Sequence, residues 1–185
     1  QRQNERLERE KHLFQLVYLD ALTCLYNRAA YVERVNTLER ESGERAICCV
    51  MLDCNCFKQI NDRFGHHVGD IVLCRVADAL RAVFSETTEH LFRIGGDEFT
   101  VILPDSSPEQ TEMLLANLAA ALESVSDELG ISISIAGGYA CTRPGESIED
   151  AFIRADAKMY QNKAVMNSQE AQRTRQSPSD DGPRG

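Results

Sequence analysis

Two adjacent carboxylates that directly follow two adjacent glycines are the residues of this chain best suited to chemistry. Residues 93–99 read Arg-Ile-Gly-Gly-Asp-Glu-Phe, between an apolar run that ends at Ile94 and another that starts at Phe99. Paired glycines between strand-like segments predict a tight hairpin turn whose backbone needs positive φ. Such a turn presents Asp97 and Glu98 to a cation or a phosphate, although in isolation a solvated hairpin tip is the simpler explanation of these residues.

A second polar block, residues 53–70, follows a short apolar run and begins with another aspartate. Lys58 in this block is suited to binding a phosphate as a point charge. A carboxylate such as Asp70 matches guanine, whose N1–H and N2–H₂ donors point the same way, and repels the N1 lone pair of adenine. Each residue also has a simpler explanation, since Lys58 could be a surface charge and Asp70 could stabilise the start of a helix.

Hydrophobic periodicity predicts the elements that must position these side chains. Gly130 is expected to end the long helix before it, as glycine commonly does at a helix C-terminus. The strand and helix order is that of the ferredoxin-like split βαββαβ arrangement, within an α+β domain. We expect helices over 28–41, 68–84, 109–129 and 148–166, strands over 46–52, 90–94, 99–103 and 131–140, and a short irregular or helical stretch over 55–65.

This topology brings the two polar segments together. A right-handed crossover makes the first two strands parallel, and the third strand lies antiparallel between them. The turn after the second strand then lies at the C-terminal end of the first strand, where Asp53 is found. Carboxylates that converge at one edge of a sheet suit Mg²⁺, which assists phosphoryl transfer by neutralising charge.

Composition limits the classes of partner. The chain has 185 residues, enough for one domain with extensions, and a net charge of −9. Neutralising the phosphates of a nucleic-acid duplex needs a basic face, so we expect no nucleic acid as partner, whereas a cation-bound nucleotide remains compatible. No apolar stretch reaches the length of a membrane span, so we expect no membrane contact.

The cysteines and the chain ends carry further expectations. Seven cysteines are present, six of them in apolar or strand-like surroundings, and we expect reduced core thiols in a cytoplasmic protein. The chain begins without Met, so we expect it to be part of a longer protein with an upstream sensory region that could attach the whole to a membrane. Residues 1–19 predict a helix, either a solvated one or a signalling stalk that pairs with a second copy. Residues 20–167 form the predicted domain, and 168–185 a disordered tail.

Four segments, taken in order, resemble the GGDEF-domain diguanylate cyclases. They are the turn motif Asp-Ala-Leu-Thr-Cys-Leu-Tyr-Asn-Arg at 20–28, the block at 53–70, the signature Gly-Gly-Asp-Glu-Phe at 95–99, and final-helix positions Ala155, Asp156, Met159, Tyr160 and Lys163. The resemblance covers about residues 20–167. It implies a palm-type core with an antiparallel-rich sheet flanked by helices, as in nucleotide cyclases. It also implies that two GTP condense to cyclic di-GMP and two pyrophosphates at a homodimer interface, with Mg²⁺ or Mn²⁺ as cofactor.

The resemblance assigns the metal and catalytic roles by position. Asp53 and Asp97 would hold the metal, assisted by the backbone carbonyl of Cys54. Asp97 would also help to deprotonate the 3′-hydroxyl, and Glu98 would have a metal or catalytic role.

The resemblance assigns the substrate contacts in the same way. Asn61 and Asp70 would read guanine, with His66 near the base or ribose, although on its own this histidine is more typical of a loop or cap. Lys58 and Lys163 would contact phosphates and stabilise developing charge.

Several positions depart from the family pattern. Cys24 stands where the turn motif usually has glycine, and Asn167 where a phosphate-contacting arginine is usual. Glu86 and Glu89 occupy the Arg and Asp positions of the family's inhibitory product site, so we expect no feedback inhibition through it. These departures leave open a catalytically weak or inactive domain that binds GTP or cyclic di-GMP as a regulatory module. A different palm-like nucleotidyl transferase is a third alternative.

Overall fold

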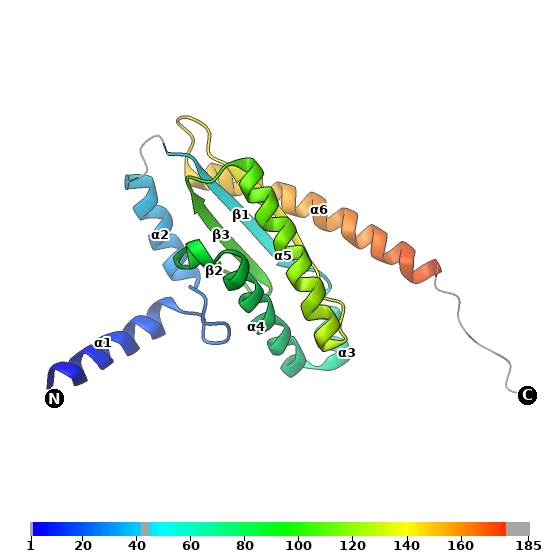
Figure 1. Cartoon of the computed structure of the whole chain (residues 1–185), viewed down its shortest axis with the longest axis horizontal. Helices are drawn as coiled ribbons and strands as arrows, with labels where there is room; N and C mark the ends of the chain where they lie inside the picture. The colour runs from blue at the N-terminus through cyan, green and yellow to red at the C-terminus, as the bar shows by residue number, and fades with distance from the viewer. Residues whose placement is uncertain (1, 42–44, 177–185) are drawn as a thin grey trace, which may run out of the picture.

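A computed structural model describes residues 2–41 and 45–176 of the chain. The strands form one central sheet with helices packed around it, and α1 extends away from it (Figure 1). In chain order the elements are α1 (Arg2–Tyr18), α2 (Arg28–Glu41), β1 (Ile47–Cys54), α3 (Phe57–Phe64), α4 (His66–Val83), the 3₁₀ helix η1 (Ser85–His90), β2 (Leu91–Arg93), β3 (Glu98–Pro104), α5 (Pro108–Leu129), β4 (Ile135–Cys141) and α6 (Ile148–Gln176).

The sheet has the predicted topology. Its strand order is β2-β3-β1-β4, and β3 pairs antiparallel with both β1 and β2. Strands β1 and β2 are therefore parallel, with β3 between them, and α3 and α4 form the crossover that connects them. The α+β fold with a βαββαβ core is confirmed.

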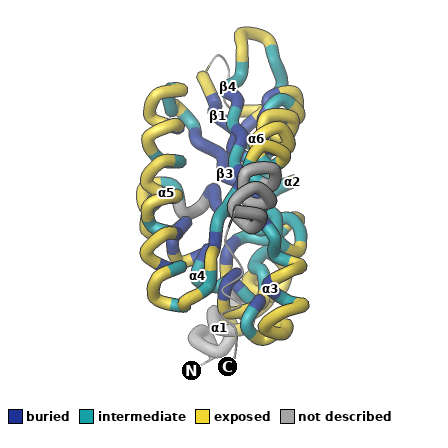
Figure 2. Tube along the Cα trace, turned by 90° about the vertical axis from the view of Figure 1, so that its right-hand side faces the viewer, coloured by how far each residue is buried: buried dark blue, intermediate teal, exposed yellow. Residues whose placement is uncertain are grey.

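The two faces of β1 belong to different parts of the core. Cys48, Val50 and Leu52 pack in the cluster that includes residues of α4 and α5. Ile47 and Cys49 pack in a second cluster with residues of α2 and α6. Figure 2 shows the buried strands between these two layers of helices. Because side chains alternate along a strand, the odd-numbered residues of β1 face α2 and α6.

Most element boundaries lie within two residues of the prediction, but the start of β4 differs by more. Strand β4 begins at Ile135 rather than at Ile131. The preceding residues instead bond to the end of α5, where Ser126 Oγ accepts from the Ile133 amide at 2.9 Å and the Ser126 carbonyl accepts from the Ile131 amide at 3.2 Å. Gly130 ends α5 as predicted, with a φ of 63°.

Helix α6 is longer than predicted. It continues beyond Met166 to Gln176, and so includes the first part of the segment predicted as a disordered tail. Residues 167–176 contain no proline or glycine to interrupt the helix. Residues 177–185 lie outside the described part of the chain.

One pair of cysteines contradicts the expectation of reduced thiols. Cys48 on β1 and Cys141 on β4 form a disulfide, and the other five cysteines are not in disulfides. The antiparallel register places these two residues directly opposite each other. The sequence could not reveal this pair because 93 positions separate them.

Helix α1 carries apolar side chains that the domain does not cover. Leu13, Phe14, Leu16 and Val17 are each about half exposed or more. Over the described residues, no helix is both long enough and apolar enough to cross a membrane.

Candidate active site

The ends of β1 and β3 bring the predicted carboxylates together. Asp53 lies directly opposite Glu98 in the antiparallel register. Both occupy the face of the sheet that α6 covers, because Val50 and Leu52 face the other layer of helices. The Cys54 amide donates to the Asp97 carbonyl at 3.1 Å, which fixes the turn beside the end of β1. The structure thus confirms that Asp53 and the signature turn lie side by side.

The signature turn uses its glycines differently from the prediction. Neither Gly95 nor Gly96 has positive φ, so that expectation is wrong. The Glu98 carbonyl accepts from the amides of Ile94 and Gly95, at 3.0 and 3.4 Å. A Cβ on Gly95 would lie 2.3 Å from Glu98 Oε2 and 3.3 Å from Glu98 Cβ. Glycine at position 95 therefore makes room for the Glu98 side chain.

Helix α6 packs against β4 without an intervening side chain. A Cβ on Gly138 would lie 2.2 Å from both the Ala155 carbonyl oxygen and the Met159 amide nitrogen. Asn162 Nδ2 also donates to the Gly137 carbonyl at 2.7 Å. This close approach brings the next residue of α6, a lysine, to the carboxylates.

Lys163 forms an ion pair with one of the predicted metal ligands. Its Nζ lies 2.6 Å from Asp53 Oδ1, and the two side chains are 30% and 9% exposed. Burial lowers the pKa of Lys163, but the hydrogen bond and charge of Asp53 and the charges of Asp97 and Glu98 outweigh it and raise the pKa. The resemblance implies that this lysine contacts phosphate, whereas here it neutralises a carboxylate.

The predicted metal ligands fit a hard cation. Burial and the nearby charge of Asp53 raise the pKa of Asp97, as expected for two carboxylates that share a site. Burial raises the pKa of the Cys54 thiol to about 12, so this thiol stays protonated and only the backbone carbonyl is suited to bind a metal. Within the described residues, no cluster of three or more His, Cys, Asp or Glu side chains could hold a metal alone. A bound Mg²⁺ would rely on two carboxylates with backbone, water and phosphate oxygens, its usual environment.

The predicted guanine-reading residues meet where α3 joins α4. Asn61 on α3 lies against Gly69 on α4, where an added Cβ would come within 1.9 Å of Asn61 Oδ1. This oxygen is buried and has no hydrogen-bond partner among the described residues, so it retains an unused acceptor that a ligand could reach once the side chain turns. Asp70 follows Gly69 directly and is exposed, as are His66 and Lys58.

Comparison with known proteins identifies the family. Residues 17–169 match the model for the diguanylate cyclase GGDEF domain. The chain belongs to the GGDEF family.

Named relatives and solved structures agree with this assignment. Diguanylate cyclase DgcP of Pseudomonas aeruginosa is 37% identical over 151 residues, which are 78% of this chain and 22% of DgcP. Diguanylate cyclase DgcN of Escherichia coli is 35% identical over 149 residues, 78% of this chain and 36% of DgcN. Among solved structures, the chain resembles the coiled coil and GGDEF domain of DgcB from Caulobacter crescentus in complex with c-di-GMP. The two superpose with a TM-score of 0.74 at 29% sequence identity, and the match covers 88% of this chain and 90% of the DgcB chain. The chain thus spans about a third or less of the length of these two curated relatives.

Sequence reasoning missed one buried residue of this GGDEF domain. Asn55 is 3% exposed, and its Nδ2 donates to Ser134 Oγ at 3.0 Å and lies 3.5 Å from the Met166 sulfur. Its Oδ1 has no partner among the described residues. A polar residue directly after the strand that ends with Asp53 and Cys54 was the available signal.

Two of the departures from the family pattern involve side chains that lie outside the described part of the structure. Glu86 is exposed in η1, whereas the side chains of Glu89 and Asn167 lie outside the described part of the structure. The absence of a product site therefore remains a prediction.

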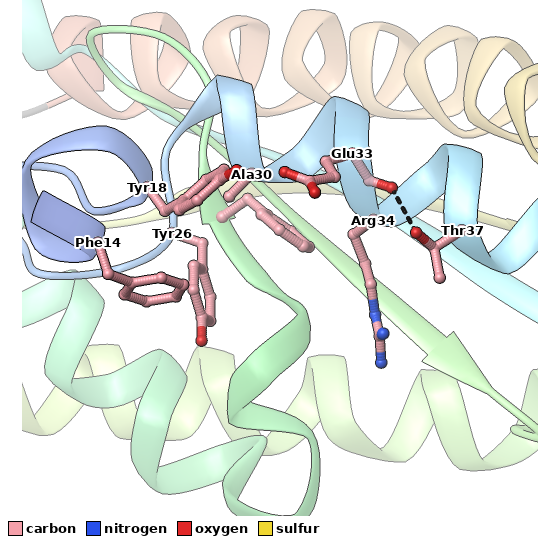
Figure 3. Close-up of a pocket in the computed structure, with 8 residues that line it drawn as sticks. Phe14, Tyr18, Tyr26, Ala30, Glu33, Arg34 and Thr37 are labelled. Carbon is pink, nitrogen blue, oxygen red and sulfur yellow. Dashed lines mark hydrogen bonds between the residues drawn. The ribbon is translucent and has the colours of Figure 1, made fainter. Parts of the chain in front are cut away.

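A separate pocket of about 280 Å³ lies between α1, α2 and β2 (Figure 3). It includes none of the predicted site residues, so it is distinct from the carboxylate site. Its lining residues are Phe14, Tyr18, Tyr26, Ala30, Glu33, Arg34, Thr37 and Phe92.

Proposed function

We propose that this GGDEF domain condenses two GTP molecules to cyclic di-GMP with release of two pyrophosphates. The observation that carries the proposal is the convergence of Asp53 and Asp97 beside Lys163, at the end of β1. The orphan acceptor on Asn61 supports guanine as the base.

The reaction consists of two equivalent transfers. In each, the 3′-hydroxyl oxygen of one GTP bonds to the α-phosphorus of the other, and the bond from that phosphorus to the bridging oxygen of pyrophosphate breaks. The hydroxyl proton leaves with a base or with solvent. Two such steps close the cyclic product and release two pyrophosphates.

The residues divide this work between binding and charge stabilisation. Asp53, Asp97 and the Cys54 carbonyl would hold Mg²⁺ or Mn²⁺, and the bound ion would supply positive charge that neutralises the phosphates. Asp97 would also help to take the proton of the 3′-hydroxyl. Glu98 adds a third carboxylate, and Lys58 would stabilise charge on the departing phosphates.

Substrate choice depends on the junction of α3 and α4. The Asp70 carboxylate accepts from N1–H and N2–H₂ of guanine, and Asn61 contributes its unpaired carbonyl oxygen. His66 lies on the same junction, near the base or ribose. Adenine would leave these acceptors unpaired, which is a strong basis for discrimination.

Catalysis requires a homodimer, because one site holds only one of the two GTP molecules. Dimer population rises with protein concentration by mass action. We therefore expect the specific activity of this chain to rise with its concentration.

The decisive experiment incubates the protein with GTP and Mg²⁺ and separates the products by chromatography. We expect cyclic di-GMP and pyrophosphate in a 1:2 ratio from the stoichiometry, and loss of both in Asp97→Ala. Asp127→Ala, an exposed carboxylate on α5, is the matched control and should keep activity. GTP that binds but stays unchanged would support the regulatory-module alternative, and a linear product would indicate a different nucleotidyl transferase.

A further inference from the structure

We propose that Lys163 is a built-in counter-ion of Asp53, which a divalent cation displaces and thereby releases toward the substrate phosphates. The proposal rests on the proposed function for the identity of the metal site and the substrate. It adds a step before chemistry, in which one lysine exchanges its partner.

The ion pair occupies the oxygen that a metal needs. Lys163 Nζ lies 2.6 Å from Asp53 Oδ1, and the carboxylate is largely shielded from water. A cation that binds this oxygen must take the place of the ammonium, because two cations at such a distance repel strongly in a shielded site. Lysine and metal therefore compete for Asp53.

The lysine also offsets repulsion at the end of the hairpin. Asp53, Glu98 and Asp97 lie together at this edge of the sheet. In the absence of metal, an ammonium on Asp53 removes part of the mutual repulsion. A divalent cation supplies more positive charge at the same place, so the lysine is no longer needed there.

The backbone around Lys163 is fastened on both sides. Asn162 Nδ2 bonds to the Gly137 carbonyl at 2.7 Å, and Met166 lies against Asn55. The close packing on Gly138 prevents α6 from sliding toward the sheet. Release of Lys163 is therefore a movement of its flexible four-carbon stem and not of the helix.

The exchange couples the two ligands of the site. While the lysine neutralises Asp53, it is not available to a phosphate, so GTP without metal gains little from it. Once metal takes Asp53, the free ammonium adds a phosphate contact. Metal and triphosphate therefore favour each other's binding, as linkage requires.

The test measures Mn²⁺ binding without nucleotide, by electron paramagnetic resonance and calorimetry. Lys163→Met should bind Mn²⁺ about tenfold more tightly than the unaltered protein, because the competing ammonium is gone. Lys158→Met removes an exposed lysine of the same helix and should leave Mn²⁺ affinity unchanged. Asp53→Asn combined with Lys163→Met should abolish the gain, which locates the effect at Asp53.

Thermal unfolding gives a second readout. In EDTA, Lys163→Met should unfold at a lower temperature because Asp53 loses its partner, and Mn²⁺ should raise its unfolding temperature more than that of the unaltered protein. Lys163→Gln should behave the same way. Equal or weaker Mn²⁺ affinity in both variants would overturn the proposal. Failure of the proposed function would instead appear as no cyclic di-GMP from the unaltered protein, which leaves the Mn²⁺ comparison intact.

Discussion

Arg93 joins Asp20 to the signature turn. Its Nη1 donates to Asp20 Oδ1 at 2.9 Å, and its Nη2 donates to the Gly96 carbonyl at 2.7 Å. Asp20 also accepts from the amide and hydroxyl of Thr23, at 2.8 and 2.7 Å. Since Asp20 lies shortly after the end of α1, the N-terminal helix is connected to the turn that carries Asp97 through one guanidinium.

Removing this connection should destabilise the domain. The Arg93 and Asp20 side chains are 12% and 24% exposed, so the pair is shielded from solvent screening. Asp20→Ala should lower the free energy of unfolding by about 1–3 kcal/mol, because it leaves a charged donor without its partner. Urea denaturation measures this loss. Asp78→Ala removes the partner of Arg81 in an exposed pair and should cost less than about 1 kcal/mol. Similar losses in both variants would contradict a special role for Asp20.

The same pair should make stability depend on acid pH. Burial raises the pKa of Asp20, but hydrogen bonds from Thr23 and Arg93 outweigh it and hold the pKa below 3.8. A lowered pKa contributes stability that is present above the ordinary value and is lost as pH falls through the folded-state value. The difference in unfolding free energy between the unaltered protein and Asp20→Asn should therefore be constant near neutrality and shrink below pH 3.8. A difference that persists unchanged at the lowest pH would show that the carboxylate charge is not its source.

Cys24 should be replaceable by glycine with a gain in stability. Its φ is 55°, in the left-handed region that favours glycine, and its amide donates to the Asp20 carbonyl at 2.8 Å. Relief of the left-handed strain should outweigh the extra chain entropy of glycine, for a net gain of up to about 1 kcal/mol. Cys24→Ser keeps the strain and is the control, with no gain expected. Thermal unfolding of both variants under reducing conditions distinguishes backbone strain from loss of the thiol.

The juxtaposition of Asp53 with the signature turn was predictable from the sequence, because it follows from two parallel strands joined by a crossover with the third strand antiparallel between them. The pairing of Lys163 with Asp53 was not, because it depends on how closely α6 approaches the sheet. The role of Gly95 was misread for a related reason. Paired glycines suggest positive φ, whereas here one of them gives space to the side chain of Glu98. The Cys48–Cys141 disulfide likewise depends on the register of β4, which no local pattern specifies.

The close contact at Gly138 should be necessary for both stability and catalysis. A methyl group there would meet backbone atoms of Ala155 and Met159 at 2.2 Å, and backbone cannot move aside as a side chain can. Gly138→Ala should lower the free energy of unfolding by about 1–3 kcal/mol and displace α6 from β4. The displacement carries Lys163 away from the end of β1, where it is proposed to reach the substrate phosphates, so cyclic di-GMP formation should fall even under conditions where the variant is fully folded. Gly137→Ala is the matched control, since its new methyl group would meet the end of the Leu52 side chain at 3.1 Å and no backbone. Circular dichroism verifies folding, and product formation from GTP measures the effect. Normal activity in folded Gly138→Ala would show that the position of α6 does not limit the reaction.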